Sequence, residues 1–246
     1  MPPPPGSWDP AWVELLGLLI LSGAYLWALR RFGGAPRWRV AAFVAGGAML
    51  VLLFVSPAST LALHYHLWAH LLQNVALAEW TPLLAVLGLT PAMAAALGGR
   101  GPVRVATHPL VALPAWLVAY AVWHVPAVYD EALRTHALLH LEHLTYFATG
   151  ILLWWPVVHD EPHRLTNGAR AIYVFAAFLL ASPIGLLITL VPEPIYAFYE
   201  EAPRIWGLDA LADQQIAGIV MAGSESVVFF AVFALYVARF FADEAG

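Results

Sequence analysis

Five histidines lie inside strongly apolar stretches of this chain, at His66, His70, His124, His140 and His143. A side chain that ionises or binds metal is costly in a bilayer, so such residues face a bundle interior and mark functional sites. Imidazole nitrogens bind Cu, Zn, Fe or Ni, and geometry rather than raw affinity selects among these metals. The five histidines therefore predict a transition-metal site, provided that the fold brings them together.

The composition is that of a membrane protein. Of the 246 residues, 61% are hydrophobic and 11% are charged, whereas soluble domains carry about 25% charged residues. Seven apolar runs are long enough to cross the hydrocarbon core as helices. They cover residues 11–29, 40–55, 61–87, 110–129, 136–158, 170–191 and 214–240. We therefore predict an all-α integral membrane protein, with a single domain of seven transmembrane helices over residues 1–246.

The arginines predict the orientation of these helices. All eleven basic residues are Arg, and nine of them fall on the side that holds the C-terminus. Only Arg134 and Arg204 fall on the other side. Cytoplasmic loops retain basic residues while translocated loops lose them. The N-terminus is therefore predicted outside and the C-terminus in the cytoplasm, in agreement with an odd number of helices.

This orientation places the histidines at similar depths. At 1.5 Å rise per residue, His66, His124 and His140 lie roughly 9 Å below the outer boundary, and His70 and His143 roughly 14 to 15 Å. The spacings i,i+4 and i,i+3 project each pair from one helix face. A single cluster in the outer half of the membrane follows. The alternatives are hydrogen bonds across helix interfaces, haem ligation or a proton path.

Other polar residues in or near the apolar runs are assigned less specific roles. His64 and His136 are interpreted as interface residues, with a role as entry-level ligands as the alternative. Met221 is interpreted as core filler, with a role as a thioether ligand as the alternative. His108, His159 and His163 are predicted to be solvated at the cytoplasmic boundary. Glu14 lies near the outer end of the first run, and Glu79 and Glu225 lie deeper in their helices. A carboxyl group in a membrane stays protonated, pairs with a partner, or carries protons or cations. The sequence does not choose among these roles.

Four separated motifs follow one another between Leu61 and Met221. They are His66-Leu-Trp-Ala-His70, Trp123-His124-Val-Pro126, Leu139-His140-Leu-Glu142-His143 and Asp213-Gln-Gln-Ile-Ala217-Gly218. Together they resemble the CtaG family of cytochrome c oxidase assembly factors, in its seven-helix bacterial branch. The resemblance implies a multi-pass protein of the bacterial inner membrane that helps to mature a haem-copper oxidase by copper delivery or insertion, without catalysis.

The resemblance also implies a ligand set and partners. The metal residues carried over from the family motifs are His66, His70, His124, His140, His143 and Asp213. Copper is the expected metal and zinc the alternative. The chain has no Cys, so imidazole must replace the thiolates that Cu(I) usually prefers. The expected partners are the oxidase subunit carrying the copper site, a copper donor protein and the lipid bilayer, with no nucleic acid.

Three other classes of protein share some of these features. A zinc-dependent intramembrane hydrolase would use three histidines with a carboxylate such as Asp213 as base, but the chain has no HExxH motif. A haem-binding cytochrome would use histidines from different helices as axial ligands. A retinal protein needs a lysine for its Schiff base, and the chain contains none.

Overall fold

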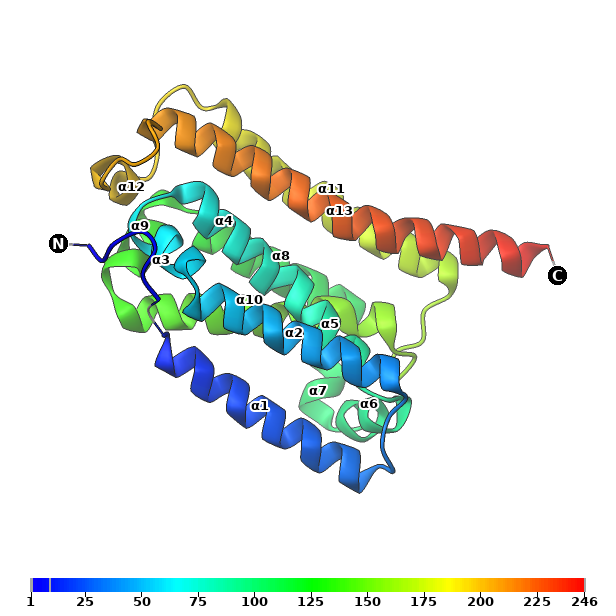
Figure 1. Cartoon of the computed structure of the whole chain (residues 1–246). Coiled ribbons are helices and arrows are strands. Elements are labelled where there is room, and N and C mark those ends of the chain that lie inside the picture. The colour runs from blue at the N-terminus through cyan, green and yellow to red at the C-terminus, as the bar shows by residue number, and fades with distance from the viewer. Residues whose placement is uncertain (1, 9, 246) are drawn as a thin grey trace.

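A computed structural model describes residues 2–8 and 10–245 (Figure 1). Every regular element among these residues is helical, so the all-α prediction is confirmed. The longer helices are α1 (Trp12–Arg31), α2 (Arg37–Val55), α8 (Pro109–Trp123), α10 (His136–Val158), α11 (Asn167–Leu190) and α13 (Ala210–Glu244). The shorter elements are α3 (Pro57–His64), α4 (Leu67–Val75), the π-helix η1 (Ala76–Trp80), α5 (Thr81–Gly88), α6 (Pro91–Gly98), α7 (Gly101–Ala106), α9 (Pro126–Arg134) and α12 (Ala197–Glu201).

Several of these helices have the length and apolarity of membrane spans. Within the described chain, five stretches qualify, and the bent pair of α8 and α9 makes a sixth if it forms one span. The helix α10 has 23 residues, but three histidines and Glu142 lower its mean hydropathy. The helices therefore indicate a multi-pass membrane protein. The count of seven spans and the orientation of the termini stay predictions.

The helices α11 and α13 lie side by side along much of their length (Figure 1). Gly218 of α13 makes this close contact possible, because a Cβ atom there would lie 2.5 Å from the Gly185 carbonyl oxygen and 2.7 Å from the Thr189 backbone nitrogen. Small residues let helix backbones approach closely in membrane bundles. Gly218 therefore sets the distance between these two helices.

The other helices lie on one side of this pair (Figure 1). The helix α4 contacts α13, α2 contacts α5, and α10 contacts both α8 and α5. The helix α1 lies at the edge of the bundle beside α2, and Tyr25 is its only buried residue. The short helices α3, α9 and α12 gather at one end of the bundle, and α6 and α7 lie toward the other (Figure 1). We call the first of these the α12 end.

The span predicted over residues 61–87 is not one continuous helix. The chain breaks between α3 and α4, and His66 has extended backbone angles, φ −129° and ψ 125°. The cause is the Asp213 carboxylate, which accepts hydrogen bonds from Leu67 N at 2.8 Å and Trp68 N at 3.3 Å. These N–H groups are unpaired at a helix start and need such an acceptor. A new helix therefore begins after His66.

The helix widens further along the same span. Pro82 has no N–H to bond the Ala78 carbonyl four residues before it, and the preceding turn is the π-helix η1. Gly150 of α10 approaches this turn, since a Cβ atom there would lie 2.2 Å from the Ala78 carbonyl oxygen. The missing side chain at Gly150 thus holds α10 against η1.

The span predicted over residues 110–129 is bent. The helices α8 and α9 meet at an angle of 75°. A residue before proline disfavours the α conformation, and Val125, which precedes Pro126, has ψ 122°. His124 therefore lies in the bend, at the end of α8, rather than inside a straight helix.

Candidate metal site

The predicted site residues all lie where their segments approach the α12 end. His66 immediately precedes α4 and His70 is in its first turn. The other four residues are His124 in the bend after α8, His140 and His143 near the start of α10, and Asp213 in the first turn of α13. The structure thus brings the six residues to one end of the bundle, but divides them among separate contacts.

Glu14 of α1 joins two of the histidines. Its Oε1 atom lies 2.6 Å from His140 Nδ1 and 2.9 Å from His143 Nδ1. Among the described residues, these three form the only group of His, Cys, Asp or Glu whose donor atoms all lie within 4.8 Å of one another. The side chain of His143 is 6% exposed and that of His140 is 33% exposed. The group is therefore accessible on the His140 side.

Tyr199 of α12 orients His70. The Tyr199 hydroxyl donates a hydrogen bond to the Ala62 carbonyl oxygen and lies 2.8 Å from His70 Nδ1. Burial raises the pKa of Tyr199 well above its usual value, so the hydroxyl keeps its proton. Because that proton is directed at Ala62, the hydroxyl oxygen accepts from His70, and Nδ1 carries the imidazole hydrogen.

The backbone of α8 orients His124. Its Nδ1 atom lies 2.7 Å from the Tyr120 carbonyl oxygen, which only accepts hydrogen bonds. The imidazole hydrogen therefore lies on Nδ1. The hydrogen bond lies within one helix, whereas the alternative to metal binding considered above was a hydrogen bond between helices. It leaves Nε2 available.

One bonding pattern is thus common to His70, His124, His140 and His143. An oxygen acceptor holds the Nδ1 hydrogen of each ring, so the lone pair lies on Nε2. In His70, His124 and His143 the Nε2 atom is buried and has no hydrogen-bond partner among the described residues. Metal-bound histidines are oriented in this way, with the second ring nitrogen donating to a carboxylate or carbonyl group. The pattern suits a metal site.

The Nε2 atoms of His70, His124 and His143 do not form a compact ligand set. The rings of His70 and His124 both lie against Tyr129, at centroid distances of 5.1 and 6.3 Å. Within the described chain, only Glu14, His140 and His143 bring three possible ligand atoms within 4.8 Å of one another, and one of these atoms is a carboxylate oxygen. One ion would bind the three Nε2 atoms together only after a side-chain movement.

His66 and Asp213 form a separate contact. His66 Nδ1 lies 3.6 Å from Asp213 Oδ1, and both His66 ring nitrogens are buried without a hydrogen-bond partner. Trp206 stacks on the His66 ring at 5.0 Å, and its backbone has the left-handed φ of 57°, which is uncommon for a bulky residue. Because Asp213 also caps α4, it is engaged by backbone donors rather than free as a general base.

Sequence reasoning missed several partners of the histidines. Glu14 carried a visible signal, because it is the only acidic residue in the first apolar run, but the sequence left open whether it pairs with a partner and did not indicate the two histidines. Tyr199 and Trp206 lie in the segment between α11 and α13, where no pattern distinguishes them from their neighbours. Their roles depend on contacts with α4 and with the residue that precedes it.

Two carboxyl groups lie outside the histidine contacts. Glu79 of η1 and Glu225 of α13 are fully buried, and their carboxylate oxygens have no hydrogen-bond partner among the described residues. Glu142 lies nearer the histidines and accepts a hydrogen bond from Asn74 at 3.1 Å. Glu79 and Glu225 are therefore not part of the candidate metal site.

The prediction that His159 is solvated was wrong. Its side chain is buried, and Nε2 donates to the Val86 carbonyl oxygen at 3.1 Å. Burial lowers the pKa of His159 to about 4, so the ring is neutral near pH 7. Its role is to connect the end of α10 to α5.

A family model described as cytochrome c oxidase caa3 assembly factor matches residues 23–243. The chain belongs to this family. The match confirms the resemblance to the CtaG family. It spans all six predicted site residues, whereas Glu14 lies before it. Membership implies an interaction with cytochrome c oxidase during its assembly. No match was found among curated proteins or among solved structures.

Proposed function

We propose that this caa3 assembly factor binds copper at the α12 end and delivers it to the oxidase. The observation that carries the proposal is the bonding pattern of His70, His124, His140 and His143, in which each Nδ1 is held by an oxygen acceptor. Each ring then offers Nε2 to an ion. Imidazole and carboxylate suit copper, with zinc as the alternative metal.

His143 is central to the proposed site. Its Nδ1 atom contacts Glu14 beside His140, and its Nε2 atom is buried without a partner, as are those of His70 and His124. We assign His140, which Glu14 orients beside His143, as the more exposed binding position, with Nε2 as the ligand atom. His70 and His124 supply the buried position, and His66 with Asp213 lies beside the start of α4.

The proposed role involves no catalysis. The protein would take copper from a donor protein and pass it to the oxidase subunit that carries the copper site, within the bacterial inner membrane. If the α12 end faces outward, the ion stays in the outer half of the bilayer throughout. Delivery then requires only that the histidines raise the local copper concentration beside the oxidase.

The proposed orientation has seven spans formed by α1, α2, the α4–η1–α5 stretch, α8 with α9, α10, α11 and α13, with the α12 end outside. The chain has no native Cys, so single cysteines report cleanly. Glu201→Cys should react with an impermeant thiol reagent in intact cells, because Glu201 is exposed at the α12 end. Glu244→Cys, at the C-terminal end of α13 and far from the α12 end, should react only after lysis. The reverse order of labelling would place the histidines on the cytoplasmic side.

The assembly role is tested by deleting the gene. The oxidase subunits should be made but contain little copper, and excess copper should partly restore activity, because mass action replaces a delivery protein. A double variant, His66→Ala with His70→Ala, should behave like the deletion, whereas His163→Ala should complement it fully. Glu225→Gln should have a much milder effect. A deletion strain with copper-replete, fully active oxidase would refute the assembly role.

A further inference from the structure

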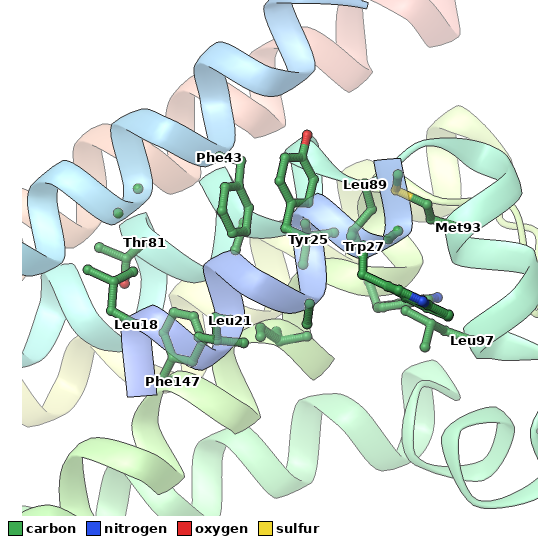
Figure 2. Close-up of a pocket in the computed structure, with 18 of the residues that line it drawn as sticks. Leu18, Leu21, Tyr25, Trp27, Phe43, Thr81, Leu89, Met93, Leu97 and Phe147 are labelled. Atoms are coloured by element: carbon green, nitrogen blue, oxygen red, sulfur yellow. The ribbon is translucent and has the colours of Figure 1, made fainter. Parts of the chain in front are cut away.

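An apolar pocket of about 330 Å³ lies between α1 and the rest of the bundle. Its walls come from α1, α2, α5, α6 and α10. Figure 2 shows Leu18 toward one end of the pocket, and Met93 and Leu97 toward the other. Tyr25 and Phe43 line it between these ends and stack at a centroid distance of 3.8 Å. The pocket is distinct from the histidine contacts.

The pocket is long enough to hold a lipid tail. Its α1 wall runs from Leu18 to Phe32, which is roughly 21 Å at 1.5 Å rise per residue. The hydrocarbon core is about 30 Å thick, so the chains of one leaflet occupy about 15 Å of it. The pocket therefore follows a membrane-spanning helix over somewhat more than one leaflet.

A positive charge lies at one end of the pocket. Arg100, after α6, is the only charged residue among those that line it. Its guanidinium group makes no ion pair with the described residues, and the residue is exposed. The guanidinium of Arg31 lies 5.6 Å from the ring of Phe32, another lining residue. Basic pockets between transmembrane helices bind anionic lipid head groups.

We propose that this pocket holds one acyl chain of an anionic phospholipid, whose phosphate pairs with Arg100. The apolar walls match the chain, and the single cation at the end matches the phosphate. The bound lipid fills the space between α1 and the bundle.

The test compares lipids retained by protein purified in mild detergent, measured by mass spectrometry of the extracted lipid. Wild-type protein should keep about one anionic phospholipid per chain through extended washing. Arg100→Gln should lower the affinity for phosphatidylglycerol by about fivefold, the effect of one basic residue near a head group. Arg104→Gln is the matched control, because Arg104 does not line the pocket, and it should bind as wild type does.

A second pair of variants tests the apolar part of the pocket. Ala24→Phe with Ala96→Phe should exclude the lipid, because both residues line the pocket and are exposed to it. Ala41→Phe with Ala92→Phe adds the same bulk to exposed positions of α2 and α6 outside the pocket and should leave lipid retention unchanged. Equal retention in the filled variant and the control would refute the proposal. So would equal affinity for phosphatidylcholine and phosphatidylglycerol, or a detergent-washed wild type free of lipid.

Discussion

Replacing His143 by alanine should remove most of the metal from the purified protein while leaving the helices folded. His143 donates from Nδ1 to Glu14, which also orients His140, and offers Nε2 to the buried histidine set, so its loss affects both positions. Glu14→Gln removes the anion that orients His140 and His143, and loss of such an orienting partner typically weakens metal binding by about 10- to 100-fold. Elemental analysis after copper loading, with circular dichroism for the fold, measures both effects.

His163→Ala is the matched control for these variants. His163 lies beyond the opposite end of α10, where Nε2 donates to the Arg104 carbonyl oxygen at 2.7 Å, and it should retain wild-type metal content. A visible spectrum of the same samples separates copper or zinc from haem, which would give a Soret band. If all three variants bound equal metal, the α12-end histidines would be hydrogen-bonded core residues only.

The substitution Gly218→Ala should strongly destabilise the bundle. The added Cβ would lie 2.5 Å from the Gly185 carbonyl oxygen and 2.7 Å from Thr189 N, and backbone atoms on α11 yield less readily than a side chain. Overpacking of this kind costs about 1 to 3 kcal/mol and sometimes more. Thermal unfolding of the purified protein in detergent should show a clearly lower Tm.

The same helix supplies a control. A Cβ atom added at Gly223 of α13 would meet no atom of another helix within 4 Å, in contrast to one at Gly218. Gly223→Ala should therefore keep or slightly raise the Tm, because alanine is up to about 1 kcal/mol better than glycine in a helix. An equal loss of stability in both variants would mean that the α11–α13 distance does not determine the effect.

The sequence predicted the helical class and the family correctly, but not where two of the spans break. The bend at His124 had a local signal in Pro126, which a straight helix over residues 110–129 overlooked. The break at His66 had none, since the carboxylate that starts α4 belongs to Asp213, 146 residues further along the chain from Leu67. Apolarity predicts which segments are buried in lipid, whereas helix starts depend on hydrogen-bond acceptors supplied by distant segments.

The candidate site was predictable in its residue types but not in its connections. The histidines within apolar runs predicted imidazole ligands, and the spacing of His140 and His143 predicted that both project from one face of their helix. The acceptors that fix each tautomer are Glu14, Tyr199 and the Tyr120 carbonyl oxygen. Two of these come from other segments of the bundle, so no local pattern in the sequence indicates them.

The Glu14 contact also has a consequence for the order of events during synthesis. Glu14 precedes His140 by 126 residues, and ribosomes add about 5 to 20 residues per second, so α1 is made roughly 6 to 25 s before its partner. A nascent chain that ends before α10 contains Glu14 but neither His140 nor His143. The more exposed binding position therefore forms only after five apolar segments have been translated, and truncated chains from interrupted translation would lack it.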